Sequence, residues 1–532
     1  MRNIELNISI VMRETEASVT EQGSIERKDD GVFCLILNGQ DKFDIDRLES
    51  ALLEVNYSAL RAALSEHLGR VIKEEACEKA REVEGGRIEE HPCLYQVDGE
   101  VGRFSFKTYD VKTGGGKFAF EGIEMFPKLH GRQWYQTCGF KELALIFGAA
   151  QRSYRQTTNI INRTRHQEIG GTPLTTLHGD AEAEGLKVLD FIASKTQSVF
   201  KSNEFTPQGV PKIKEMVIKQ IPKPSRIRKN VIQPALTAVC AEMSEKGLEE
   251  ADIAHVRKTA CPNKNYEQKA KCVYISIDDF GVKEQKKERS KKGVAKKNQD
   301  NQPDTPKATR PMVQNTVARI EQGDKGFTLT GRSVMEVLMF VLAFLLNNTL
   351  LKQDIKFCID GQRSLQDTIL SFFSWHPRLT LLLDWFHVVK KFKEDLSLAC
   401  KGREIRNRHL KKLLRLLWFG LIDKAKAYLI AIPPADLKND QIIARLIGYL
   451  DRNRKCLPCY AMRSQLHLPN SSNPVERCNN LVTANRQKHH GMSWSEHGSY
   501  ALTALNAVVI NKATRQWVEK RVIPLTWHEG AA

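Results

Sequence analysis

An alternation of apolar strand-like and helix-like segments begins at Val273 and dominates the second half of the chain. The segments VYISIDDFGV, TVARIEQ and GFTLTG predict three strands, and residues 334–346 predict a buried helix. The segment DIKFCIDG predicts a fourth strand, residues 362–374 carry apolar side chains at helical spacing, and LTLLLDWFH predicts a fifth strand. The order βββαβαβα is typical of one mixed sheet that is antiparallel in its first half and parallel in its second, which needs helices on both faces. The fold class is therefore α/β.

Three acidic residues stand where such a sheet would bring them together. Asp278 lies near the end of the first strand, and Asp360 lies at the end of the fourth. Glu476 lies in the first turn of a helix whose start is marked by a capping residue and by Pro474. The first and fourth strands are neighbours in this sheet, about 4.8 Å apart, so side chains at their ends can share a metal ion.

Two further acids compete for these roles. Asp279 follows Asp278 directly, and strand alternation puts the two side chains on opposite faces, so only one of them can bind the metal; we prefer Asp278. Asp384, on the fifth strand, would lie about twice as far from Asp278 as Asp360 does. Taken singly, an Asp before Gly also fits a turn, and a Glu at the third helical position also fits a capping box.

The negative charge of three converging carboxylates must be compensated, because even one buried unpaired charge costs several kcal/mol. Divalent cations remove that cost, and hard oxygen ligands with open positions suit Mg²⁺ or Mn²⁺. Two such ions about 4 Å apart would activate a water or a 3′-hydroxyl and stabilise the leaving oxygen at phosphorus. The pattern predicts a phosphoryl-transfer site.

The charge balance favours a polyanionic partner. Lys and Arg number 81 against 63 acidic residues, which gives a net charge of +18. Residues 283–310 contain almost no apolar side chains and form either a phosphate-gripping segment or a solvated linker. After His387 the chain is helical and basic up to about Asn470, and this block contains the candidate DNA-binding residues Lys390, Lys391, Arg406, Arg408, Lys411 and Lys412.

The N-terminal half shows no chemistry of its own. Residues 1–135 mix a helix over 45–71 with short strands and turns over 95–120, which predicts an α+β region. Residues 136–260 are predicted to be helical. Within them, a helix up to Thr164 and a second helix that begins at Thr172 or Pro173 fit either a helix-turn-helix or a plain helical hairpin.

No segment has the pattern of a signal peptide or a membrane span, so we expect no membrane partner and a cytoplasmic protein. The 12 cysteines are scattered, mostly in apolar runs, as expected of reduced core thiols. Cys456 and Cys459 have the spacing of a zinc knuckle. Because no second pair accompanies them, loop thiols are the preferred interpretation.

Four stretches together carry a resemblance to a known family: YISIDDFGV, CIDGQRSLQDTI, LLLDWFHVVKKF and NPVERCNNLVTANRQKHHGMSWSEHGSYALTAL. The region from Val273 to Ala507 resembles the DDE transposases of the Mutator-like group and related bacterial insertion sequences, which carry an Asp-x-x-His signature. The resemblance implies an RNase H-like catalytic domain over 261–387 and 471–532, interrupted by an all-α basic insertion over 388–470. The resemblance assigns Asp278, Asp360 and Glu476 as the catalytic triad that binds metal. It assigns Asp384 and His387 as the signature pair.

The resemblance also implies a function. Such an enzyme binds the ends of a mobile element in double-stranded DNA, cleaves them and joins the 3′-hydroxyl ends to target DNA. It acts as a homo-oligomer, associated with the nucleoid in a bacterial cytoplasm, with two Mg²⁺ or Mn²⁺ ions. The alternatives are a DNA-binding protein that has lost catalysis and an RNase H-like structure-specific nuclease.

A few residues near this region keep two interpretations each. His387 is either a packed histidine at a strand end or a group near the scissile phosphate. Arg486 and Lys488 either hold a phosphate beside the site or belong to a solvated helix end. Trp385 and Trp494 favour a core role over stacking on a base.

Overall fold

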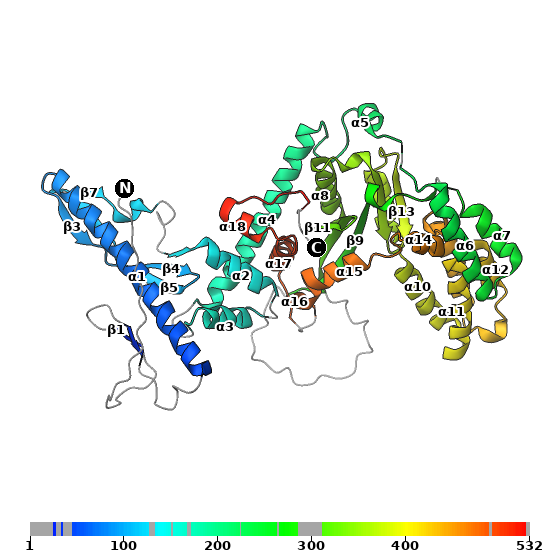
Figure 1. Cartoon of the computed structure of the whole chain (residues 1–532), viewed down its shortest axis with the longest axis horizontal. Helices are drawn as coiled ribbons and strands as arrows, with labels where there is room; N and C mark the ends of the chain where they lie inside the picture. The colour runs from blue at the N-terminus through cyan, green and yellow to red at the C-terminus, as the bar shows by residue number, and fades with distance from the viewer. Residues whose placement is uncertain are drawn as a thin grey trace, which may run out of the picture. The chain divides into compact units, whose positions relative to one another are not determined.

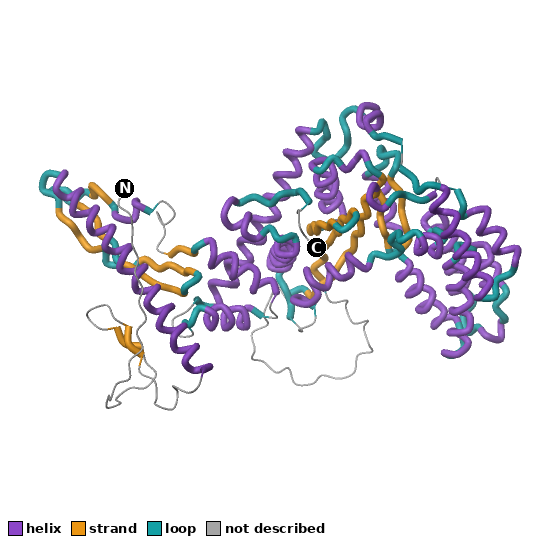
Figure 2. The backbone as a smooth tube through the Cα atoms, viewed as in Figure 1, coloured by secondary structure: helices purple, strands orange, loops and turns teal. Residues whose placement is uncertain are grey.

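The computed structural model describes residues 25–27, 33–35, 45–126, 134–150, 153–167, 172–223, 225–262, 265–285, 311–488 and 492–527. Most of the Lys-rich segment of 283–310 and the three residues that follow Lys488 lie outside this range. The chain divides into two compact units: unit 1 comprises Met1–Leu143 and Thr158–Pro173, and unit 2 comprises Ala144–Thr157 and Leu174–Ala532 (Figure 1). Figure 2 shows that both contain helices and strands, so the α/β class is confirmed. In the described part of the chain, no helix combines the length and hydropathy needed to cross a membrane.

Unit 1 is built around one long helix, and both predicted features of this region are present. Its elements are β1 (Ile25–Arg27), β2 (Phe33–Leu35), α1 (Ile45–Glu82), β3 (Arg87–Glu90), β4 (Tyr95–Gly99), β5 (Gly102–Phe106), β6 (Tyr109–Lys112), β7 (Phe118–Phe120) and β8 (Trp134–Gln136). Ile72 of α1 packs on Val97, Phe106 and Ile123 in a small core. Apolar burial of this kind holds the short strands on the helix.

The sheet of unit 2 consists of β9 (Cys272–Lys283), β10 (Met312–Gln322), β11 (Lys325–Gly331), β12 (Asp354–Ile359) and β13 (Leu379–Leu383). The strand order is β11-β10-β9-β12-β13. The pairs β11·β10 and β10·β9 are antiparallel, whereas β9·β12 and β12·β13 are parallel. All five predicted strands are therefore present, and the first and fourth are neighbours as predicted.

Helices cover both faces of this sheet, as a mixed sheet requires. On one face, α8 (Val334–Asn347) packs on β10 and β11, and Phe344 stacks on Phe327 with ring centroids 4.6 Å apart. On the other face, α15 (Asn473–Asn479) and α17 (Glu496–Ile510) pack on the sheet (Figure 1). Val317 of β10 belongs to the second face because it packs with Val475 of α15.

The remaining helices of unit 2 precede the sheet or follow it in the chain, except for α9, which connects β12 to β13. They are α5 (Lys214–Gln220), α6 (Lys229–Glu245), α7 (Glu250–Thr259), α9 (Arg363–Phe372), α10 (Trp385–Ala399), α11 (Arg403–Trp418), α12 (Ile422–Ile430), α13 (Gln441–Asn453), α14 (Tyr460–Gln465), α16 (Asn485–Gln487) and α18 (Thr514–Lys520). The predicted insertion of 388–470 is helical. It packs against α6 and α7, and Lys424 of α12 pairs with Glu249 and Asp252.

The helix-turn-helix expectation does not match the helices that form. The segment expected to be one helix up to Thr164 is two, α2 (Cys138–Ala150) and α3 (Tyr154–Thr164). The helix expected to follow as a short one is α4 (Leu174–Ser202), whose 29 residues pack on α8 and α17. Its apolar positions continue through Val188 and Ile192, so burial in the core of unit 2 extends it beyond a short recognition helix.

The position of Asp278 and one strand boundary differ from the prediction. The first strand matches VYISIDDFGV to within one residue at each end, but Asp278 lies in the middle of β9 and not near its end, because β10 pairs with β9 as far as Lys283. Strand β13 ends at Leu383, and Asp384 is the N-cap of α10, where its side chain accepts a hydrogen bond from the backbone N–H of Phe386. His387 is thus in the first turn of a helix and not at a strand end, because a capping carboxylate stabilises the helix start.

Candidate active site

Asp278 and Asp360 lie side by side in the register of two parallel strands. The pairing of β9 with β12 extends to Ser276 opposite Cys358, and two further residues along each strand bring Asp278 level with Asp360 on one face. The two carboxyl groups interact electrostatically. Partial burial, together with the charge of Asp360, raises the pKa of Asp278 to about 6.

The helix α15 covers the face to which Asp278 points. Asp278 pairs with Val317 across β9 and β10, so both side chains lie on the same face, and Val317 packs with Val475. One turn further along α15, Asn479 donates a hydrogen bond from Nδ2 to Oδ2 of Asp278. Asn479 is only 4% exposed, and its Oδ1 has no hydrogen-bond partner in the described part of the chain. A buried amide oxygen of this kind is available to a cation or a water.

Glu476 precedes Asn479 by three residues, so the two side chains share one face of α15. The Glu476 carboxylate contacts His387, with Oε1 3.2 Å from Nε2, which is an ion pair whenever His387 is protonated. The charge of His387 also acts on Asp278, whose pKa it lowers against the effects of burial and Asp360. These interactions bring Asp278, Asp360, Glu476 and His387 into one neighbourhood, to which Asn479 belongs through its hydrogen bond to Asp278.

Asp384 joins the helix that carries His387 to the segment that leads into α15. Its side chain is fully buried, and Oδ1 accepts the Phe386 N–H at 2.7 Å. Oδ2 accepts the Ser472 N–H at 2.8 Å and the Ser472 hydroxyl. Because these donors occupy both oxygens, Asp384 positions His387 and Glu476 relative to each other and is a poor metal ligand.

Asp279 points away from this neighbourhood. It is exposed, and its Oδ1 accepts the hydroxyl of Thr316, the residue opposite it on β10. Asp360 is only partly buried, and its Oδ1 accepts the backbone N–H of Gln362 at 2.8 Å, which holds the carboxylate at the turn after β12. Of the neighbouring Asp residues, Asp278 is therefore the one that faces Asp360.

The two cations proposed beside the site differ in position. Arg486 is 2% exposed, and its guanidinium lies 4.5 Å from the ring centroid of Tyr154 and 5.8 Å from that of Trp494. Both earlier interpretations fail for Arg486, since it is a core residue that holds Trp494 in place. Lys488 is exposed and lies 4.6 Å from the ring centroid of Phe280, two residues after Asp278. It therefore keeps its place as a candidate phosphate contact.

The basic residues of the insertion lie on α10 and α11, and several have partners. Lys390 and Lys411 are exposed, Lys391 pairs with Asp395, Arg406 donates to Ser397 and Asn407, Arg408 pairs with Asp436, and Lys412 lies over the ring of Tyr428.

The donor set fits a hard divalent cation, although no group of three or more His, Cys, Asp and Glu side chains is assembled as a metal cluster among the described residues. Asp278, Asp360 and the unpaired Oδ1 of Asn479 all offer oxygen. Asn479 was absent from the predicted site, and its only sequence signal is the three-residue spacing from Glu476. Burial raises the pKa of the Cys459 thiol to about 12, and among the described residues the Cys456–Cys459 pair belongs to no group of three or more His, Cys, Asp and Glu that could hold a metal.

Comparison with models of known protein families and with curated proteins found no match to this chain.

Proposed function

We propose that unit 2 is a metal-dependent phosphoryl transferase that acts on nucleic acid. One observation carries this proposal: Asp278 on β9 and Asp360, directly after the adjacent parallel strand β12, interact electrostatically under a helix that brings Glu476 and Asn479 to the same face. A purely structural pair of neighbouring carboxylates is destabilising, and burial followed by the charge of Asp360 raises the pKa of Asp278.

More specifically, we propose a DDE transposase with an RNase H-like catalytic domain. The strand order and directions of β9 to β13 support this fold, as do the helical block between β13 and the helix of Glu476 and the resemblance carried by the four motif stretches. The net charge of +18 supports DNA as the partner. Because two element ends must be joined in one event, the active form would be an oligomer.

The residues have distinct roles in this proposal. Asp278, Asp360 and Glu476 would hold Mg²⁺ or Mn²⁺, which supply activation of the attacking oxygen and stabilisation of the leaving oxygen. Asn479 orients Asp278 through its amide N–H, and His387 fixes the carboxylate of Glu476. Asp384 keeps the helix starts that carry His387 and Glu476 together.

The experiment uses the full chain with duplexes made from the DNA that flanks its gene, in Mg²⁺. Wild type should nick the duplex and join pre-cut 3′-hydroxyl ends to a target plasmid. Asp360→Asn should abolish both reactions and keep duplex affinity. Asp367→Asn, on the exposed face of α9, is the matched control and should react as wild type does.

Three outcomes separate the rival functions. Joined product supports a transposase, whereas hydrolysis without joining identifies a nuclease. Duplex binding with no metal-dependent reaction identifies a DNA-binding protein without catalysis. If about eight phosphates are neutralised, log affinity falls against log salt with a slope of about −7, and a slope near zero removes DNA from the proposal.

A further inference from the structure

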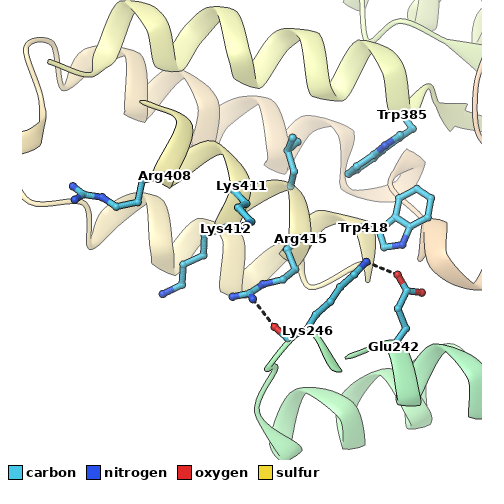
Figure 3. A pocket seen from close by; sticks show the side chains of 9 residues that line it. Glu242, Lys246, Trp385, Arg408, Lys411, Lys412, Arg415 and Trp418 are labelled. Carbon is cyan, nitrogen blue, oxygen red and sulfur yellow. Dashed lines mark hydrogen bonds and ion pairs between the residues drawn. The ribbon is translucent and has the colours of Figure 1, made fainter. Parts of the chain in front are cut away.

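A cavity of about 800 Å³ opens between α6 and α11, next to the first residue of α10 (Figure 3). Its wall combines two tryptophans, Trp385 and Trp418, with an excess of positive charge. The charged residues of the wall are Glu242, Lys246, Arg408, Lys411, Lys412 and Arg415. Five cations against one carboxylate make this a site for an anion.

The cations of α11 form a track along one helix face. Arg408, Lys411, Lys412 and Arg415 are three or four residues apart, so they share a face, and Trp418 follows three residues after Arg415. From Arg408 to Trp418 the helix rises about 15 Å. Figure 3 shows the track leading along α11 towards the paired rings of Trp385 and Trp418.

Several of these cations are available to a ligand. Lys246 pairs with Glu242, and Arg408 pairs with Asp436 at 2.6 Å. Within the described ranges, no acidic side chain forms an ion pair with Lys411, Lys412 or Arg415; Arg415 donates from Nη1 to the carbonyl of Lys246, and Lys412 lies over the ring of Tyr428. A fixed positive charge without an acidic partner favours a phosphate.

The aromatic end of the cavity is rigid. Trp385 meets Trp418 at 5.1 Å between ring centroids and Tyr460 at 4.8 Å. The Tyr460 hydroxyl is anchored on the carbonyl of Leu383 at 2.7 Å. Both tryptophans are only partly buried and line the cavity, so the cluster offers ring surface on which a planar group can stack.

We propose that this cavity binds unpaired nucleotides of DNA, with a base stacked on the Trp385–Trp418 cluster and the phosphates held by Lys411, Lys412 and Arg415. Aromatic faces beside a basic track are the chemistry that recognises single strands without sequence preference. Trp385 and His387 both lie in the first turn of α10, so the cavity and the candidate active site adjoin the same helix start. The choice of DNA rests on the proposed function; the preference for an unpaired strand rests on the cavity alone.

The test measures binding of a fluorescent oligothymidylate to the full chain, in EDTA to prevent cleavage, at several salt concentrations. Trp418→Ala should weaken binding by about tenfold or more. Lys411→Gln should lower the slope of log affinity against log salt by about 0.7. The matched control is Lys393→Gln, an exposed lysine of α10 outside the cavity, which should change neither value.

Because Trp418 packs on Tyr460, its loss could disturb folding, so Trp418→Phe is included and should restore most of the affinity. The proposal is overturned if Lys411→Gln and Lys393→Gln show the same single-strand affinity and the same salt slope, and if Trp418→Phe and Trp418→Ala both bind as wild type does. Tighter binding of oligouridylate than of oligothymidylate overturns the assignment to DNA. Trp418-dependent binding by a chain that neither cuts nor joins DNA supports the cavity and refutes only the proposed catalysis.

Discussion

Asp278→Asn removes a carboxylate that the fold holds at an energetic cost in the absence of metal. The pKa of Asp278 rises from 3.8 to about 6 on folding, and two units at 1.36 kcal/mol each amount to about 3 kcal/mol. The folded pKa lies above the unfolded one, so the associated stability is present below pH 3.8 and is lost as the pH rises through 6. Asn cannot ionise and should therefore stabilise the metal-free protein at pH 8 by about 3 kcal/mol, and by roughly half of that at pH 5.

Urea unfolding in EDTA, followed by tryptophan fluorescence, measures this difference, because all of the seven tryptophans except Trp134 belong to unit 2. Asp279→Asn, on the opposite face and exposed, is the control and should change stability by less than about 0.5 kcal/mol. Equal stability of Asp278→Asn and wild type at pH 8, or a gain that does not shrink towards pH 5, would refute the reasoning. Added Mg²⁺ should stabilise wild type and leave Asp278→Asn unchanged.

Three other substitutions test the surroundings of the site. Ser472→Ala removes one of the hydrogen-bond donors to the buried Asp384 carboxylate, so urea unfolding should show a free energy of unfolding lower by about 1–3 kcal/mol. An unchanged unfolding midpoint would contradict the contact. His387→Gln removes the imidazole that contacts Glu476, so single-turnover cleavage should slow by about 10- to 100-fold at unchanged duplex affinity, whereas wild-type rates would exclude a positioning role. Glu267→Gln removes the carboxylate that pairs with buried Arg463 at 2.9 Å. It should lower the free energy of unfolding by about 3–5 kcal/mol at pH 7. Because the pKa of Glu267 is lowered from 4.5 to about 2, this stability is present above pH 4.5 and lost towards pH 2, and a loss that persists at pH 2 would contradict the assignment.

The sheet was predictable because its strands are long apolar runs separated by clear breaks. VYISIDDFGV and DIKFCIDG both appear as strands, and their adjacency follows from the order of strands and helices. Asp278 and Asp360 could be placed beside each other for the same reason, since register along two parallel strands is a regular geometry.

The features of the fold and site that could not be predicted depend on contacts between distant parts of the chain. Asn479 reaches Asp278 only because Val475 packs on Val317, and neither residue indicates that contact locally. The sequence LLLDWFH reads equally as a longer strand or as a strand followed by a capped helix, and the hydrogen bonds from Ser472 help to hold Asp384 at the cap. Helix α4 was expected to be short because its burial against α17 is invisible in its own sequence.

The most direct measurement is a crystal structure of the full chain with Mn²⁺, in which anomalous scattering locates the metal. The proposed function predicts Mn²⁺ bound by Asp278 and Asp360, with Glu476 within reach of the same site, and loss of that signal in Asp360→Asn crystals. Mn²⁺ bound elsewhere with these carboxylates unliganded, or an unchanged signal after Asp360→Asn, would contradict it.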